Sequence, residues 1–384
     1  MPQSPESFVG WIKRTVVGLE DVPARDRIVN LSTSGVHTAT VDTWFERTCR
    51  DRLPHLIDRM AATNEFGLPA LKAAIRQRYR VPEDREIYLT AGASAAYRLI
   101  CESLFAGSRG LEVLVESPTY QPLAILPARY GAKIVDVPVP LKRAPGDLAA
   151  AFGRSVRPST TALVSSNLHN PTGSFLTRDE LGQLARAVTA VAPKITLIVD
   201  ETFLGLGPEP FRTAADLHPC IVTVSSLTKT FGLGQLRCGW VIADKARYPQ
   251  LLDDWIQFES IGSKILEALS VLAFEQLDTL LDEGLDHLAK NRNLMATSTD
   301  ELRQSGLLDG EIPNSGCLYF PRWRGRTDLD VVAQRLKDDF GVLISPGRFF
   351  GDGCKDHLRI GFGGGGNVVR DGLERLSRGM RAMA

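Results

Sequence analysis

The stretch SSLTKTFGLGQLRCGW, residues 225–240, places one lysine among hydroxyl side chains and glycines, eight residues before Arg237. Lys229 has no Asp or Glu within ten residues on either side. An amine without a carboxylate partner loses its proton more readily, and the neutral amine is the form that attacks carbonyl groups. The segment therefore indicates a reactive lysine, and a solvated surface charge is the plainer alternative.

Other polar residues follow directly after apolar runs that are typical of buried strands. In open α/β sheets, ligands bind at the carboxyl ends of the strands. The turn after EIYLT opens a helix, whose free N–H groups suit a phosphate. The sequence therefore predicts one site that combines an acid, an amide, a lysine, an aromatic ring and a helix start. Its members are Asp200, Asn170 (in HNPTG), Tyr120 (in SPTY), Ser225, Ser226, Thr228, Lys229 and the turn Gly92-Ala93-Ser94.

The elements that must position these residues alternate between strand-like and helix-like patterns from about residue 85 to residue 245. Such alternation predicts a mostly parallel sheet with helices on both faces. The continuously apolar runs ITLIV and CIVTV are typical of strands buried on both sides. A turn or helix start just after Gly92 begins the helical segment ASAAYRLICESLF.

The pattern changes after residue 262. Residues 263–304 are helix-periodic throughout and predict a long connecting helix, followed by short strands and a closing helix over 368–384. We therefore divide the chain into an N-terminal segment (1–50) that packs with the smaller unit, a large domain (51–262) and a small α+β domain (263–384). The glycine run GFGGGG, residues 361–366, is interpreted as a flexible turn.

Composition excludes several classes of protein. The chain has 384 residues, with 45 Lys plus Arg and 45 Asp plus Glu, so bulk charge predicts neither a nucleic-acid partner nor a membrane surface. Six cysteines are scattered without a CxxC pair, which is typical of reduced thiols in a cytoplasmic protein. Six dispersed histidines show no metal-ligand spacing, so we expect no metal. No apolar stretch approaches the length of a membrane span, and the first residues lack the pattern of a secretory signal.

Taken in order, the motifs FGLPALKAAI, TAGASAAY, SPTY, HNPTG, VDETF, SLTKTFGLGQLRCGW, GVLISPG and HLRIGFG resemble the class I/II aminotransferases. These are fold-type I enzymes that use pyridoxal 5′-phosphate (PLP). The resemblance covers nearly the whole chain. It implies a mostly parallel seven-stranded sheet flanked by helices, a smaller α+β domain, an α-amino acid substrate, and a homodimer.

The resemblance also implies roles for the residues around the reacting centre. Lys229 would form a Schiff base with PLP and later move the Cα proton. Asp200 would pair with the pyridine nitrogen, Asn170 would donate to the ring oxygen O3′, and Tyr120 would stack on the ring. Arg359 in HLRIGFG would grip the substrate α-carboxylate as a fork, and Gly35 in STSGVH would lie near that carboxylate.

At the phosphate, the resemblance implies charge-assisted contacts from Arg237 and hydroxyl or backbone contacts from its neighbours. The GLGQLR segment does not complete a dinucleotide-binding glycine motif, because Arg237 stands where its third glycine belongs. The other members of this set are Ser226, Thr228, Gly92, Ala93 and Ser94.

Two positions depart from the family. Phe203 stands where ordinary members carry a tyrosine that bonds O3′, and Ala62 stands where a tyrosine reaches the phosphate of the partner subunit. Phe203 is kept among the residues that line the cofactor, but it supplies no hydroxyl. Both losses indicate a specialised site.

A narrower resemblance, in STSGVHTATV, SPTYQPL and RIGFGG, is to capreomycidine-synthase-like enzymes, which eliminate and cyclise a hydroxylated arginine. Transamination is our default prediction for this chain. Elimination or cyclisation is the close alternative, and carbon–sulfur lyase or arginine-oxidising chemistry stays open, because the fold does not fix the reaction. A PLP-binding transcriptional regulator is disfavoured, since the chain shows no basic excess and no added DNA-binding segment.

Overall fold

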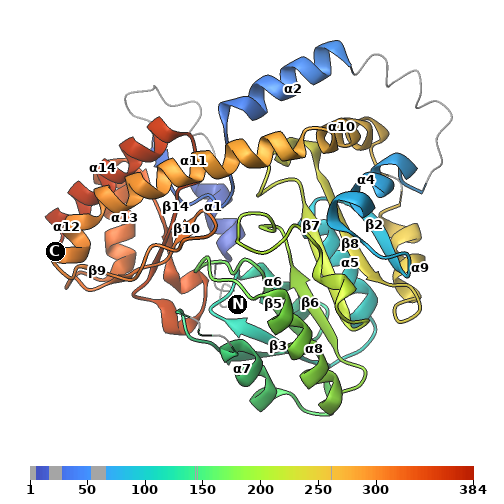
Figure 1. The fold of residues 1–384 in the computed structure, drawn as a ribbon. Coiled ribbons are helices and arrows are strands. Elements are labelled where there is room, and N and C mark those ends of the chain that lie inside the picture. Colours follow the sequence, from blue (N-terminus) through green and yellow to red (C-terminus); the bar gives the residue numbers. More distant parts are fainter. Residues whose placement is uncertain (1–5, 17–27, 53–65, 143, 145, 261) are drawn as a thin grey trace.

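The structure is a computed structural model that describes residues 6–16, 28–52, 66–142, 144, 146–260 and 262–384 (Figure 1). Its largest element is a seven-stranded sheet with the strand order β2-β8-β7-β6-β5-β3-β4. β8 is antiparallel to both of its neighbours, and the other pairs are parallel. The strands are β2 (Arg85–Ala91), β3 (Glu112–Ser117), β4 (Lys133–Pro138), β5 (Thr160–Ser166), β6 (Thr196–Asp200), β7 (Ile221–Ser226) and β8 (Cys238–Asp244). The predicted mostly parallel, seven-stranded sheet is confirmed.

Helices cover both faces of this sheet. Alternate residues of each strand point to opposite sides, and so Val113 and Val115 of β3 lie in one hydrophobic cluster while Leu114 lies in another. The first cluster is closed by α5 (Ala93–Phe105), α6 (Pro122–Arg129) and α9 (Gln250–Phe258), and the second by α7 (Asp147–Ser155) and α8 (Arg178–Val191). Burying one such valine or leucine contributes roughly 1.5–3 kcal/mol, so these faces hold the strand ends in fixed register.

A third hydrophobic cluster lies over β2 and β8. It includes Ile87, Leu89, Trp240 and Ile242 from the two strands. The helices that pack there are α4 (Pro69–Tyr79) and α10 (Lys264–Phe274), and α2 (Ala39–Asp51) contributes Val41.

The prediction of one continuous connecting helix over residues 263–304 is wrong. The segment forms three helices, α10, α11 (Leu277–Ser298) and α12 (Asp300–Gln304), of which only α11 is long.

The remaining strands are short and form three small sheets with orders β10-β14-β13, β1-β12 and β11-β9. β1, near the N-terminal end, pairs in parallel with β12, so residues of the first fifty join this region. The strands are β1 (Val29–Asn30), β9 (Leu308–Asp309), β10 (Leu318–Tyr319), β11 (Arg322–Trp323), β12 (Val342–Leu343), β13 (Ser345–Pro346) and β14 (Leu358–Gly361). The division of the chain at residues 51 and 263 stays a prediction.

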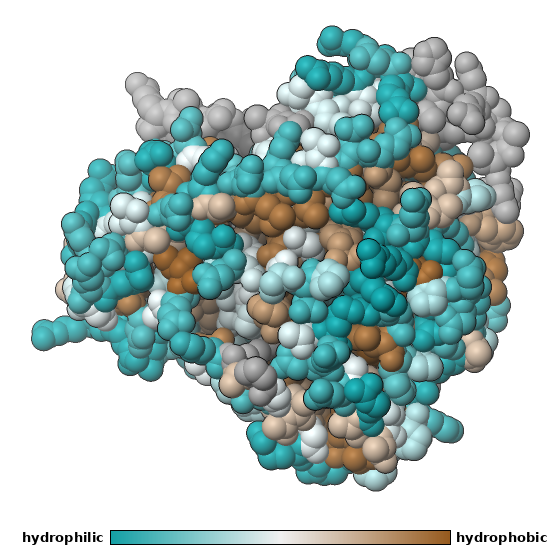
Figure 2. All heavy atoms as spheres, in the orientation of Figure 1, coloured by the Kyte–Doolittle hydropathy of each residue, from teal (hydrophilic) through white to brown (hydrophobic). Residues whose placement is uncertain are grey.

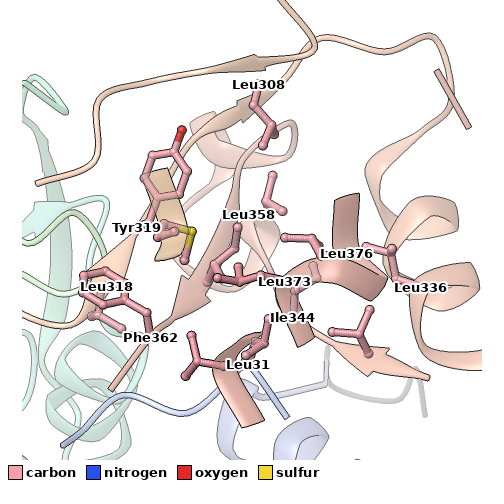
Figure 3. Packing of buried hydrophobic residues seen from close by; sticks show 14 of the residues in the cluster. Leu31, Leu308, Leu318, Tyr319, Leu336, Ile344, Leu358, Phe362, Leu373 and Leu376 are labelled. Atoms are coloured by element: carbon pink, nitrogen blue, oxygen red, sulfur yellow. The ribbon is translucent and has the colours of Figure 1, made fainter. Parts of the chain in front are cut away.

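The second region has its own core. α11, α13 (Leu329–Phe340) and α14 (Gly366–Ala382) pack around it, and Figure 1 shows α11 crossing from the large sheet to this region. Figure 3 shows Leu31 of the N-terminal part beside Ile344 in this core. Leu358 and Ile360 of β14 face the core, so the residue between them, Arg359, faces the other side of the strand.

The glycine run 361–366 connects β14 to α14, as predicted for a turn, and its flexibility stays a prediction. Gly361 ends β14 and Gly366 begins α14. A Cβ on Gly361 would lie 1.9 Å from the carbonyl oxygen of Thr33, and one on Gly363 would lie 2.1 Å from that of Gly35. Gly361 and Gly363 therefore allow the backbone of this run to lie directly against the backbone of residues 33–35.

Four short 3-10 turns and one N-terminal helix lie outside the elements described above, among the described residues. The turns are η2 (Ala214–Asp216), η3 (Gly234–Leu236), η4 (Gly347–Phe349) and η5 (Asp352–Cys354), and one further helix, α1, spans Phe8–Val16. On the face drawn in Figure 2, hydrophilic side chains cover most of the surface and hydrophobic ones form small separate groups. Within the described ranges, no helix is both long and apolar enough to cross a membrane.

Candidate active site

The predicted site residues gather at one edge of the large sheet. β2, β3, β5, β6 and β7 all end at this edge, and the antiparallel β8 begins there. Asp200 ends β6 opposite Ser166 of β5, and Ser226 ends β7 opposite Gly239 of β8. Arg237 immediately precedes β8 and so reaches the same edge. The sequence prediction that these residues share a strand-end edge therefore agrees with the fold.

One end of the site is a cradle at the start of α5. Gly92, with φ +90°, precedes the helix, and no side chain caps the helix. The first N–H groups of a helix have no partner inside the helix, and Ala93 and Ser94 carry the first two here. Arg237 donates from Nη2 to the carbonyl oxygen of Ala91 at 2.8 Å, and a Cβ on Gly92 would lie 2.6 Å from the same Nη2. The cradle thus offers N–H groups and a guanidinium where a side chain would not fit.

Two hydroxyl residues flank this cradle. Ser226 is buried, and its Oγ accepts the N–H of Thr228 at 3.3 Å. Thr228 is half-buried and precedes Lys229. Together with the helix N-terminus and Arg237, these groups have the chemistry that a phosphate dianion requires.

Lys229 lies between the sheet and the segment of residues 32–37. Its carbonyl oxygen accepts the N–H of Val36 at 2.8 Å, and a Cβ on Gly35 would lie 3.3 Å from its Cδ. Burial lowers the pKa of Lys229, and the nearby charge of Arg359 lowers it further, against the opposing influence of Cys317 and Asp200. A larger share of the side chain is therefore neutral amine at a given pH than for an exposed lysine.

Asp200 is a buried carboxylic acid whose charge acts on this amine. Its Oδ1 accepts the N–H of Thr202 at 2.9 Å. Burial raises the pKa of Asp200, while the hydrogen bonds from Thr202 and the charge of Lys229 lower it. Tyr120 lies within electrostatic reach of both Asp200 and Arg359, and burial raises its pKa. A cationic ring nitrogen beside Asp200 would compensate the buried carboxylate.

The other end of the site is Arg359, whose side chain is 1% exposed. Nη1 donates to Asn170 Oδ1 at 2.9 Å, and Nη2 donates to the carbonyl oxygen of Ser32 at 2.6 Å and to Ser345 Oγ at 3.4 Å. The guanidinium packs against the neighbouring rings of Phe8 and Phe350, 5.1 and 4.9 Å from their centroids, which are themselves 5.5 Å apart. The guanidinium is thus held by this aromatic pair and by hydrogen bonds from two of its nitrogens.

Arg359 nevertheless lacks a compensating anion. Its Nε is buried and has no hydrogen-bond partner, and in the part of the chain that the structure describes no carboxylate pairs with it. Burial lowers its pKa to about 10, so it stays charged at neutral pH. A buried, unpaired charge is costly, and an anionic ligand removes that cost.

The geometry therefore brings together most of the residues that the sequence singled out. Arg359 and Asn170 share a hydrogen bond, Gly35 touches Lys229, and Asp200 and Tyr120 lie within electrostatic reach of the same centre. The cradle residues form the opposite end. Phe203 is buried in the hydrophobic cluster of the second region with Leu168 and Leu206, and its place beside the cofactor stays a prediction. Ala62 lies outside the described residues.

Sequence reasoning missed the groups that hold Arg359. Ser32 and Ser345 belong to STSG and GVLISPG, which were identified only as motifs, and nothing in the sequence marked Phe8 or Phe350. Cys317 was counted only as a scattered thiol. Its buried side chain lies near Lys229 and Arg359, and burial raises its pKa to about 11.

Comparison with known proteins agrees with this geometry. Residues 27–376 match the model of the family described as aminotransferase class I and II. The chain is 29% identical to capreomycidine synthase of Streptomyces vinaceus over 319 residues, which are 81% of this chain and 77% of that protein. It is 25% identical to the arginine–pyruvate transaminase of Pseudomonas aeruginosa over 343 residues, 84% of each chain. The crystal structure of the PLP-dependent cyclase OrfR superposes with a TM-score of 0.82 at 24% identity, covering 100% of this chain and 99% of that one.

Proposed function

The chain belongs to the aminotransferase class I and II family, and within that family we propose that it transfers the amino group of an α-amino acid to a 2-oxo acid. Its cofactor is PLP, as in the family. One observation carries the proposal. Arg359 is a buried cation with an unsatisfied Nε, and its charge acts on Lys229, so a carboxylate bound to Arg359 would bring its Cα toward the amine.

The cradle supports a role in holding the cofactor phosphate. We assign Arg237, Ser226, Thr228 and the N–H groups of Ala93 and Ser94 to it, with Gly92 providing the space. Bound PLP supplies an electron-withdrawing ring that weakens the bonds at the substrate Cα. The chain provides the position and the charge balance.

Three side chains are assigned to the ring. Asp200 would keep a positive charge on the ring nitrogen, Tyr120 would pack against the ring, and Asn170 would donate to the ring oxygen. Asn170 Oδ1 is occupied by Arg359, so the amide NH2 is the group that it turns toward a ligand. Phe203 adds an apolar wall without a hydroxyl.

Lys229 is assigned two tasks, holding the cofactor through a Schiff base and moving the Cα proton. Its lowered pKa supports both, since each requires the neutral amine. Arg359 fixes the carboxylate as a fork, and Gly35 leaves room beside the Lys229 stem.

The test is a mass-spectrometric product screen of the PLP-loaded protein against single amino acids, each with and without a 2-oxo acid. Arginine and a hydroxylated arginine belong in the panel. Formation of the 2-oxo product only when an acceptor is present is expected for transamination. Loss of water or ammonia without an acceptor would contradict it.

Elimination with cyclisation is the second candidate. It is favoured by the 29% identity to capreomycidine synthase and by the full-length likeness to the cyclase OrfR. The absence of a hydroxyl at Phe203 agrees with a site that departs from ordinary transaminases. The same screen separates the two reactions, because only elimination proceeds without an acceptor.

We also propose that the protein is a homodimer. Of nine exposed large hydrophobic side chains among the described residues, five lie at Phe66 and in or beside α9 and α10, including Phe258 and Ile265. Grouped exposed apolar side chains mark protein interfaces. Phe258 and Arg237 line one cavity of about 250 Å³, so this face adjoins the cradle. A solution mass near that of one 42.0 kDa chain, measured by light scattering with PLP bound, would contradict the proposal.

A cytoplasmic location is proposed from the thiols. Cys101, Cys220, Cys238, Cys317 and Cys354 are all buried and unpaired by disulfides. Buried reduced thiols are typical of a reducing compartment.

A further inference from the structure

A buried carboxylate lies directly behind the site, in a place that the proposed function does not use. Glu116, near the end of β3, has a side chain with 0% exposure. Its Oε1 accepts the backbone N–H of Ser166 at 2.6 Å and the Ser166 hydroxyl at 3.3 Å. A buried carboxylate requires such donors, so Glu116 fixes the orientation of the Ser166 hydroxyl.

His169 is the second group of this cluster, and its side chain is 1% exposed. Nε2 lies 2.8 Å from the carbonyl oxygen of Pro118, which can only accept, so Nε2 carries a proton. Nδ1 lies 2.7 Å from Thr172 Oγ1. Nε2 is also 3.7 Å from Glu116 Oε1. The imidazole is thus held at both nitrogens, with its Nε2 near the carboxylate.

A chain of hydrogen bonds leads from this cluster to the substrate end of the site. The Ser166 hydroxyl donates to Glu116, which leaves its lone pairs to accept the backbone N–H of Asn170 at 3.2 Å. The Oδ1 of Asn170 accepts from Arg359 Nη1 at 2.9 Å. All three hydrogen bonds have the same direction: Arg359 donates to Asn170, Asn170 donates to Ser166, and Ser166 donates to Glu116.

We propose that Glu116 and Ser166, with His169 beside them, are positioning residues that fix Asn170 and, through it, the guanidinium of Arg359. This rests on the proposed role of Arg359 in binding the substrate carboxylate. Glu116 reaches Asn170 through Ser166, and its charge also raises the pKa of Asp200. Ser166→Ala keeps that charge and therefore tests the hydrogen-bonded chain by itself. Hydrogen bonds to a charged acceptor are roughly twice as strong as neutral ones, and the buried charge is what makes the chain stiff.

The chain offers two matched controls. Ser165 is the neighbour of Ser166 on β5, equally buried, and its Oγ has no hydrogen-bond partner. Glu112 lies on β3 like Glu116 and accepts a hydroxyl bond from Thr160 of β5 at 2.8 Å, but at the opposite end of the strands. A purely structural effect of weakening β3 or β5 would therefore appear in the controls as well.

The experiment compares Ser166→Ala with Ser165→Ala, and Glu116→Gln with Glu112→Gln, in the PLP-loaded enzyme. The substrate is the amino acid identified in the product screen. We expect Ser166→Ala and Glu116→Gln to raise KM about fivefold or more, because binding geometry is lost. In Ser166→Ala, which keeps the charge of Glu116 near Asp200, kcat should change much less. Neither control is expected to change KM. Equal KM values in wild type and both test variants would overturn the proposal, as would an equal rise in the controls.

Amide hydrogen exchange, followed by mass spectrometry on the same proteins, needs no substrate. The backbone amide of Asn170 should exchange faster in Ser166→Ala and Glu116→Gln than in wild type. In Ser165→Ala and Glu112→Gln its exchange rate should equal that of the wild type. Unchanged exchange in the test variants would overturn the link to Asn170. If the wild type turns over no amino acid, the proposed function fails on that result, and the exchange data still decide whether Glu116 and Ser166 hold Asn170.

Discussion

The two ends of the proposed site each use an arginine, in opposite surroundings. Arg237 is exposed and rests on the backbone of Ala91 beside a helix start. Arg359 is buried against a pair of aromatic rings and held by Asn170, Ser32 and Ser345. The cradle is made by two adjacent strands, whereas four segments far apart in the chain make the surroundings of Arg359.

The difference has a physical consequence. An exposed cation shares its ligand with water, and its contribution to binding is screened. A buried cation without a carboxylate partner attracts an anion strongly, because no water surrounds the cation to screen its charge. We therefore expect the Arg359 end to contribute more to specificity and the Arg237 end to contribute mainly to cofactor retention.

The largest effect is expected between the two ends, at Lys229. Lys229→Ala should lower kcat by at least about a thousandfold, since removal of a positioned proton-transfer group costs factors of about 10²–10⁴. Borohydride reduction followed by peptide mapping of the wild type should find the cofactor on Lys229. Attachment to another lysine would contradict the assignment of the whole site.

Arg359→Ala should lower kcat/KM by about thirtyfold or more, because truncating one partner of a desolvated charge pair costs about 2 kcal/mol or more. Arg359→Lys should recover only part of this loss, since an ammonium lacks the planar fork. The visible absorbance of bound PLP should persist in both variants. An unchanged kcat/KM would show that another group binds the carboxylate.

Arg237→Ala tests the opposite end. PLP affinity, measured by titration of the apoprotein, should fall on the order of tenfold, a modest value for an exposed charge-assisted contact. At saturating PLP, KM for the amino acid should stay close to the wild-type value. A rise in KM as large as that in Arg359→Ala would contradict the assignment of Arg237 to the cofactor and Arg359 to the substrate.

The pH dependence of PLP attachment connects the two arginines. The charge of Arg359 lowers the pKa of Lys229, so its removal in Arg359→Ala raises that pKa. The neutral amine then appears at higher pH, and the pH at which the apoprotein captures PLP at half its maximal rate should move upward. A stopped-flow series from neutral to alkaline pH measures this midpoint. A downward movement would exclude Arg359 as a neighbour of Lys229.

The smallest effect is expected at Gly35. A methyl group there would lie 3.3 Å from Lys229 Cδ, which forces the lysine stem to move by a few tenths of an ångström. Gly35→Ala should lower kcat about threefold, because small misplacements of a reacting group cost rate. Gly364→Ala is the control, since its nearest neighbour would be Val369 Cγ2 at an ordinary 3.7 Å. Equal rates for both variants would mean that Gly35 does not restrict Lys229.

The sequence alone determined the sheet and the strand-end residues. Apolar runs such as ITLIV and CIVTV could only be buried strands, and the residues after them had to meet at one edge, since parallel strands end together. The start of α5 after Gly92 was predicted to the residue. Ordered family motifs supplied the cofactor and the family, which the match over residues 27–376 confirms.

Only the tertiary structure decided the surroundings of Arg359 and the role of the glycine run. Ser32, Asn170 and Ser345 meet Arg359 because β14 pairs with β13 and the segment of residues 31–35 packs on Gly361 and Gly363. The contacts with Ser32 and Asn170 leave no local pattern, since these residues lie more than a hundred positions from Arg359 and segments so far apart impose no periodicity on each other. The same reason hid the chain from Arg359 through Asn170 and Ser166 to Glu116, in which each residue alone reads as an ordinary strand-end polar group.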